Sequence, residues 1–316
     1  MRSDRVGVEA WPALPLAAWQ DTYEALHMRT QIVGKTCLAF APAQNHWWHV
    51  ALQLTARGLT TGPLVAGGLT FDVSFDFVEH QVAVRTHLGA TRLIPLVAQP
   101  VADFYRQYLA MLAELGISMK LWPAPVEVVR SIPFADDREH TAYDPAYVQR
   151  WWRIMSQVDQ ALKRFRGRFL GKSSPSHFWW GGFDLACTRF SGRPAPRHPG
   201  GIPNCPNYVM EEAYSHECAS CGFWPGGGLV AAVAEPAFYA YIYPAPAGYS
   251  EGAVPSPGVF NRELGEFILP YDAMRTAARP EETLLTFLES TYAAAANLAG
   301  WDRRALERTA PADVSR

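Results

Sequence analysis

The sequence has little charge and few cysteines. Of its 316 residues, 18% are Asp, Glu, Lys or Arg, and the formal net charge is -2. No long run of Lys or Arg occurs, so the electrostatic footprint of a phosphate-backbone binder is missing and we expect no nucleic-acid partner. Five cysteines is an odd number in a chain too long to need disulfide bonds, which indicates reduced thiols.

Long apolar runs are missing as well. The longest uncharged stretches, such as 222–234, are rich in Gly and Pro and too short to span a bilayer as a helix. The first residues, MRSDRVGVEAWPALPLAAW, lack the continuous apolar core of a signal peptide, since Glu9, Pro12 and Pro15 interrupt it. We therefore expect no membrane partner and a cytoplasmic location.

Two nucleotide-binding signatures are absent too. There is no P-loop, and no GxGxxG motif opens a βαβ unit. Hydride transfer by a Rossmann-bound nicotinamide and P-loop phosphoryl transfer are therefore not expected. With 49% hydrophobic and 13% aromatic residues, the chain is expected to fold around a substantial core.

Periodicity and capping signals predict four helices. They cover 16–33, ending at Gly34, 101–117, closing at Gly116, 143–170, starting at Asp144-Pro145, and 280–300. β-branched and aromatic alternation predicts strands, which lie at 46–57, 69–86, 91–96, 174–193, 237–245 and 265–273. The segment 118–132 is predicted to be a further strand or an extended crossover.

The order helix, about four strands, helix therefore occurs twice, and this predicts an internal duplication. Residues 1–130 form one half, and residues 131–316 form the other with an irregular insertion at about 192–234. Trp47-Trp48 aligns with Trp179-Trp180 and superposes Arg57 on Arg189. Gly34-Lys35 matches Gly171-Lys172 at the cost of a five-residue gap. We expect one compact α+β unit with two antiparallel sheets, each with helices on one face. A ligand would lie on a sheet face or between the halves.

Motifs in both halves carry a resemblance to a known family. They are VGK, LGK, NHWWHV, LTARGLTT, HFWWGGFDLACTRFSGR, YSHE, GFWPGGG, GEFILPYDA and LAGWDR. Nearly end to end, the chain resembles the bacterial domain-of-unknown-function family 5996, and this resemblance implies no activity. Cys218 and Cys221 stand where the family pattern leads us to expect uncharged, non-thiol residues, so a role for these thiols is not implied by the family.

The paired strands supply the first candidate site. Strand alternation places Trp47, His49 and Arg57 on one mixed polar face, and His46 on an apolar face with Trp48. The same parity separates two sets in the second stretch: His177, Trp179 and Arg189 against Trp180, Asp184 and Thr188. We predict that the substrate-binding residues, in which the arginines fix an acidic group, are Trp47, His49, Arg57, Trp179 and Arg189. In the alternative, the Trp side chains are core and each Arg pairs with a carboxylate.

The densest chemical segment is EEAYSHECASC, at 211–221. His177, His216 and Glu217 could hold a divalent Zn, Fe or Mn ion with an open coordination position. A weaker alternative is a closed zinc site of Cys205, His216, Cys218 and Cys221. Without a metal, His216 beside Glu217 could act as an acid/base pair, and Tyr214 could donate to an oxyanion.

Together these features predict a small-molecule-binding protein with a Trp-, Arg- and His-lined pocket. The sequence leaves open whether it is a metal-dependent hydrolytic or oxidative enzyme. The alternative is a non-enzymatic ligand-binding or assembly protein in which the same residues are structural.

Overall fold

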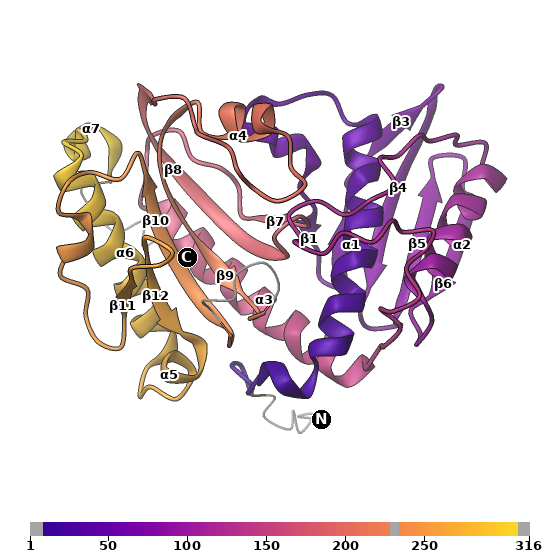
Figure 1. Cartoon of the computed structure of the whole chain (residues 1–316), viewed down its shortest axis with the longest axis horizontal. Coiled ribbons are helices and arrows are strands. Elements are labelled where there is room, and N and C mark those ends of the chain that lie inside the picture. Colours follow the sequence, from indigo (N-terminus) through magenta and orange to yellow (C-terminus); the bar gives the residue numbers. More distant parts are fainter. Residues whose placement is uncertain (1–8, 228–233, 309–316) are drawn as a thin grey trace, which may run out of the picture.

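Two antiparallel sheets, each of six strands in the described residues, form the framework of the chain (Figure 1). The computed structural model describes residues 9–227 and 234–308. Helices pack on the sheets, so the predicted α+β fold is confirmed. No helix in these ranges is both long and apolar enough to cross a membrane.

The first sheet runs in the order β1-β2-β4-β5-β6, with β3 paired to β4. On β4, Phe71, Val73 and Phe75 are buried while Asp72 and Ser74 are partly exposed, because successive side chains point to opposite faces. Helices α1 and α2 cover the buried face. The elements are α1 (Gln20–Phe40), β1 (Gln53–Leu54), β2 (Gly58–Thr60), β3 (Leu64–Ala66), β4 (Leu69–Asp76), β5 (Gln81–Thr86), β6 (Thr91–Pro95) and α2 (Val101–Glu114).

The second sheet runs in the order β7-β8-β9-β10-β12-β11. Helices α3 and α6 pack against β8, β9 and β10. The elements are α3 (Pro145–Gly167), β7 (His177–Trp179), β8 (Asp184–Pro194), α4 (Asn207–Ala213), β9 (His216–Trp224), β10 (Ala237–Tyr243), β11 (Val259–Asn261), β12 (Glu266–Pro270), α5 (Tyr271–Arg275), α6 (Pro280–Leu298) and α7 (Arg303–Leu306). Three 3-10 helices are η1 (Leu16–Ala18), η2 (Asn45–Val50) and η3 (Tyr249–Glu251).

The two sheets meet at their first strands, β1 and β7 (Figure 1). Leu52 and Phe178 exchange backbone hydrogen bonds of 3.0 and 2.9 Å at this junction. The indole Nε1 of Trp180 donates to the carbonyl of Val50 at 2.7 Å. Each half therefore presents its first strand to the other, as a twofold-related pair would, which agrees with the predicted duplication.

Two lysines cross this junction in opposite directions. Lys35, on α1, lies over the ring of Trp180 at 5.5 Å from its centroid. Lys172, after α3, lies over the ring of Trp48 at 5.4 Å. Each lysine contacts a tryptophan of the other half, so the two Gly-Lys pairs found in the sequence have related positions.

Three predicted helices are confirmed, and one predicted helix end is wrong. Helices α2, α3 and α6 lie where expected, and the carboxylate of Asp144 caps α3 by accepting from the backbone N–H of Ala146 at 2.9 Å. Helix α1 does not end at Gly34 but continues to Phe40. A Cβ at residue 34 would overlap the indole of Trp180, so this glycine serves a close contact and not a C-cap.

The strand predicted at 46–57 begins instead as a 3-10 helix. His46 and Trp47 have left-handed φ angles of 57° and 61° within η2, and regular strand pairing starts only at Gln53. The alternation assumed for HWWH is therefore wrong there, because helical and left-handed residues do not alternate faces.

The stretch predicted as one strand at 174–193 is a hairpin. β7 and β8 pair antiparallel around a turn at 180–183 that contains Gly181 and Gly182. The predicted insertion at 192–234 contains β9, which pairs with β8 and β10 inside the sheet. The segment 118–132, predicted to be extended, contains no strand.

Candidate ligand-binding site

A cavity of about 1530 Å³ lies over the face of the second sheet opposite to α3 and α6. Its floor comes from alternate residues of β8, β9, β10 and β12. Register fixes this set, because Thr188 pairs with Ser220, and Ser220 pairs with Tyr241. Directly opposed residues of neighbouring strands project from the same face. The floor therefore consists of Asp184, Ala186, Thr188, Phe190, Cys218, Ser220, Trp224, Tyr239, Tyr241 and Glu266.

The walls come from irregular segments of both halves. They are η2, the crossover between α2 and α3, the 180–182 turn, and the connection from β8 to β9 that contains α4. In Figure 1 α4 lies at one end of the space between the second sheet and α1. Aromatic side chains dominate the lining, as is common for small-molecule pockets. They include Trp47, Trp48, Trp122, Trp179, Trp180, Tyr208, Tyr214 and Tyr243.

A glycine on the central strand allows a hydrogen bond across it. Tyr239 on β10 donates its hydroxyl hydrogen to Oδ2 of Asp184 on β8, although β9 lies between these strands. Gly222 occupies the intervening position, and a Cβ there would lie 2.5 Å from the Tyr239 hydroxyl oxygen and from the Leu185 carbonyl oxygen. Trp224 stacks on Tyr239 at 4.1 Å and holds its ring against the sheet. The Asp184–Tyr239 pair is thus positioned by its neighbours.

Three carboxyl groups line the cavity. Burial raises the pKa of Asp184 to about 7. Burial, with the nearby charge of Asp184, raises the pKa of Glu127 to about 7 and that of Glu266 to about 8. Water is displaced from the charged forms and like charges repel, so near neutral pH these groups lie close to the point of ionisation.

Glu127 reaches this cluster from the crossover segment. Its backbone has a φ of 58°, and its N–H donates to the Pro203 carbonyl at 2.9 Å. A Cβ added at Gly182 would lie 2.9 Å from Oδ1 of Asp184 and 3.6 Å from Oε2 of Glu127. Both carboxyl groups therefore border the same small space, which the 181–182 glycines leave open. The pair was predicted in mid-strand and lies in the turn, where the lack of side chains allows this close approach.

Glu266 lacks a partner. Its Oε2 is buried, and no described residue forms a hydrogen bond with it. A buried acceptor without a donor typically costs about 1–3 kcal/mol, more when charged. The floor therefore presents an unmet hydrogen-bonding group.

Three further polar side chains, those of Tyr214, Tyr241 and Lys35, line the cavity. The hydroxyls of Tyr214 and Tyr241 hydrogen-bond at 2.6 Å, and burial raises the pKa of both. Lys35 is 2% exposed, and burial lowers its pKa to about 8. Within the described residues, Lys35 forms no ion pair with the three carboxyl groups.

Three of the predicted site residues reach the cavity. Trp47, Trp179 and Tyr214 line it, whereas His49, Arg57 and Arg189 do not. The Nδ1 of His49 accepts from the backbone N–H of Gln44 at 3.1 Å.

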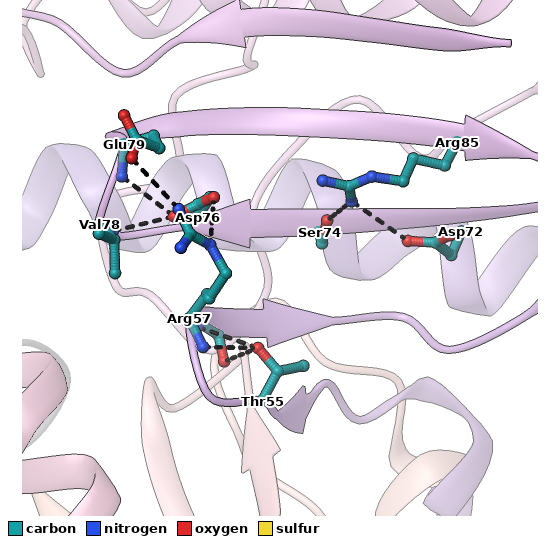
Figure 2. Close-up of polar contacts among 9 residues, drawn as sticks. Thr55, Arg57, Asp72, Ser74, Asp76, Val78, Glu79 and Arg85 are labelled. Atoms are coloured by element: carbon teal, nitrogen blue, oxygen red, sulfur yellow. Dashed lines mark hydrogen bonds and ion pairs between the residues drawn. The ribbon is translucent and has the colours of Figure 1, made fainter.

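Arg57 lies on the first sheet, away from the cavity. Figure 2 shows it beside Asp76 and Glu79, and its Nε donates to Oδ2 of Asp76 at 2.8 Å. Arg85 forms a similar exposed group with Asp72 and Ser74 on the same sheet. The predicted role of Arg57 in fixing a substrate acid thus has no geometric support, and the pairing with carboxylates matches the structural alternative.

Arg189 projects from β8 toward the helices. Its guanidinium is buried, donates to the Phe165 carbonyl and lies 4.3 Å from the ring centroid of Tyr292. Glu289 provides a carboxylate at 3.5 Å. Alternation holds within β8, where Asp184 and Thr188 line the cavity and Arg189 points to the helices. The predicted set of His177, Trp179 and Arg189 is divided by the turn at 180–183, because Trp179 pairs with Asp184 and lies on the cavity side of the sheet.

The three predicted metal ligands make other contacts. Glu217 accepts from Ser191 and from Arg193, at 2.9 and 2.8 Å. His216 contacts the hydroxyl of Ser215 through Nδ1, and His177 packs edge-on against Trp179. Across residues 9–227 and 234–308, no group of three or more His, Cys, Asp or Glu side chains is placed to hold a metal ion.

The alternative zinc site fails by strand geometry. Cys218 and Cys221 are three residues apart on β9, so they point to opposite faces of the sheet. Cys218 lines the cavity, whereas the thiol of Cys221 approaches the Cys187 carbonyl. All five cysteines are free.

A GxSxG motif outside the cavity does not have the backbone geometry of a serine-hydrolase nucleophile. Residues 248–252 read GYSEG, the GxSxG pattern of serine hydrolases. The motif lies on the short 3-10 helix η3, not on the strand-to-helix turn that exposes such a nucleophile.

The carboxyl cluster was not predicted from the sequence. Strand parity separates Asp184 from the predicted binding residues, and Glu127 and Glu266 belong to no candidate motif. One signal was available, because Tyr239, Tyr241 and Tyr243 alternate along β10 and mark one polar aromatic face.

The comparison with family models covers nearly all of these elements. The model described as a family of unknown function, DUF5996, matches residues 11–308. The chain belongs to DUF5996. The match includes both sheets and every cavity-lining segment, so the site described above lies within the DUF5996 region. Neither the curated proteins nor the solved structures contain a match to this chain.

Proposed function

We propose that this protein binds a small organic molecule in the cavity over the second sheet. The observation that carries the proposal is the unpartnered, buried Oε2 of Glu266 in an aromatic-lined cavity. Burial of this oxygen without a hydrogen-bond donor destabilises the folded chain. A bound ligand could supply the donor and offset that cost.

The size and lining of the cavity favour this function over a purely structural role. At about 1530 Å³ it exceeds the range of about 300–1,000 Å³ that is usual for ligand pockets. The walls hold polar groups from both halves, as orientation of a ligand requires.

The proposal is limited to binding. The chemistry first expected of His216 and Glu217 has no support from their positions, because the Glu217 carboxylate is held by Arg193. Carboxyl groups with a pKa near 7 can act as general acids or bases, so the cavity contains groups suited to a reaction.

The test is to identify what the protein carries after purification. We expect mass spectrometry of the denatured protein to detect a stoichiometric small molecule. Ser220→Phe places a ring on the cavity floor and should remove it. Ser74→Phe makes the same change on the exposed face of the first sheet and should retain it.

The result has a clear negative. The proposal fails under two conditions together. Wild type, Ser220→Phe and Ser74→Phe would all purify without a bound molecule, and Ser220→Phe and Ser74→Phe would bind every added ligand with the same affinity. Circular dichroism of each variant separates loss of ligand from loss of fold. Trp224→Ala provides a second floor variant if Ser220→Phe does not fold.

A further inference from the structure

We infer that the ligand carries a positively charged amine, which the carboxyl groups of Asp184, Glu127 and Glu266 bind among the aromatic walls. This inference rests on the proposed function and specifies its substrate class.

The balance of charge in the lining supports a cation. Three acids come from three separate elements, β8, the crossover and β12, so they converge only in the folded chain. Among the described residues of the lining there is one Lys and no Arg. Lys35 is held over the rings of Trp180 and Phe134, and forms no ion pair with the acids. The acids therefore lack a counter-ion from the described part of the protein.

The walls suit the body of an organic cation. Trp224, Tyr239 and Tyr241 lie on the same floor as the carboxyl groups of Asp184 and Glu266. Tyr239 is stacked between the other two rings, with centroid distances of 4.1 Å to Trp224 and 6.0 Å to Tyr241. Ring faces attract ammonium groups through their quadrupole, most strongly when water is excluded. An anionic ligand would meet three acids here, and a neutral one would leave any ionised acid without charge compensation.

Because the three carboxyl groups titrate near neutral pH, the affinity for a cationic ligand should depend on pH. The titratable groups around the acids are mostly tyrosines: Tyr239 and Tyr241 from β10, Tyr214 from the end of α4, Tyr23 from α1 near Asp184 and Tyr249 from η3 near Glu266. Cys205 from the β8–β9 connection and Lys35 from α1 complete the set. In the free protein the three acids bind protons near neutral pH, and a bound cation favours their charged forms. Binding must therefore release protons, and affinity must rise as the pH increases from about 6 to about 8.

The experiment uses three probes that share a phenyl body and differ in charge: phenethylamine, 2-phenylethanol and 3-phenylpropionate. Isothermal titration calorimetry on the full chain measures each affinity at pH about 6 and about 8. We expect phenethylamine to bind about tenfold or more tightly than the other two, and more tightly at the higher pH. The tenfold preference corresponds to about 1.4 kcal/mol.

Carboxamide variants locate the cation. Glu266→Gln and Asp184→Asn should each weaken phenethylamine about tenfold to hundredfold while leaving 2-phenylethanol unchanged. Glu79→Gln removes an exposed acid of the first sheet and should change nothing. Heat released in two buffers of different ionisation enthalpy reports the expected proton release.

Several outcomes would overturn the inference. Equal binding of all three probes, a preference for the propionate, or no binding of phenethylamine would each reject a cationic ligand. The first two results would leave the proposed function standing, because the cavity would still bind. The proposed function is judged separately, by the co-purified ligand and the Ser220→Phe variant.

Discussion

Gly222 is the residue on which the Asp184–Tyr239 hydrogen bond depends. Any side chain at this position would meet the Tyr239 hydroxyl and the Leu185 backbone oxygen. The tyrosine ring could move aside, but the backbone of β8 could not. Glycine is thus required here by packing, since its φ is not in the left-handed region.

Gly222→Ala should destabilise the protein by about 1–3 kcal/mol, the usual cost of overpacking. Urea denaturation measures this change. Gly167→Ala is the matched control, because a Cβ at the end of α3 meets no atom within 4 Å. A free energy of unfolding that is equal in the two variants would contradict the close contact.

The carboxyl cluster predicts how stability depends on pH. The folded-state pKa values of Asp184, Glu127 and Glu266, about 7, 7 and 8, lie above the ordinary carboxyl values. The stability that they contribute is complete below about pH 4 and is lost as the pH rises through 7 to 8. His27 and His177 act in the opposite direction, because burial lowers the pKa of each to about 4, and they reduce stability below about pH 6.5.

The free energy of unfolding should therefore fall between pH about 6.5 and about 8, by about 1 kcal/mol or more. Above this range, the lowered pKa of Lys35 opposes the trend. Urea denaturation at the two pH values measures the difference in ligand-free protein, and Glu266→Gln should reduce it. A flat or rising profile in wild type would show that the acids are not protonated in the folded state.

At the scale of elements, the sequence predicts the alternation of side chains along β8, but it does not predict which face of β8 packs against the helices. Its alternation was predictable, because a strand has only one periodicity. Which face met the helices was not predictable, because that depends on where α3 and α6 pack. Arg189 was thus predicted to bind substrate, although Phe165, Tyr292 and Glu289 surround it.

Arg189→Leu tests this assignment of the two faces. The variant removes the hydrogen bond to the buried Phe165 carbonyl and one of the two arginine partners of Glu289, which keeps Arg168, and should lower stability by about 1–3 kcal/mol. Phenethylamine affinity, measured where the variant is folded, should match wild type. A selective loss of affinity would restore Arg189 to the binding site.

The structure of the HWWH segment could not be predicted, because two of its residues have an unusual backbone conformation. HWWH has strand-forming residues, yet its left-handed His46 and Trp47 place Trp47 in the cavity wall. His46 is held there by Lys172, whose Nζ lies 2.7 Å from its Nε2, and by the Ala213 carbonyl. Contacts between residues so far apart in the chain cannot be read from local pattern.

At the scale of the molecule, the α+β class and the repeated order of elements were predictable. They follow from periodicity and cap signals, as at α2, α3 and α6, where long amphipathic patterns leave few alternatives. The carboxyl cluster could not be predicted in the same way. It needs the register of four strands and the path of the irregular crossover that carries Glu127.

The junction between the sheets predicts cooperative unfolding. The indole of Trp180 fills the space above Gly34 and bonds to Val50, so neither half has a complete surface alone. We expect tryptophan fluorescence and far-ultraviolet circular dichroism to give a single, coincident urea transition. Trp180→Ala should lower its midpoint sharply, whereas Trp122→Ala, at an exposed position, should change it little. Two separate transitions in wild type would contradict this coupling.

The division of the cavity between a hydrogen-bonded floor and irregular walls also bears on redesign. Floor positions are tied to their neighbours by strand register, so a change at one of them disturbs the ladder. The crossover that carries Trp122 and Glu127 contains no strand and has no ladder to preserve. Val126 and Glu127 are held by hydrogen bonds to Gln31 and Pro203, but the exposed stretch around Trp122 can be varied with less risk to folding. That stretch is therefore the natural one to randomise when selecting variants for new ligands.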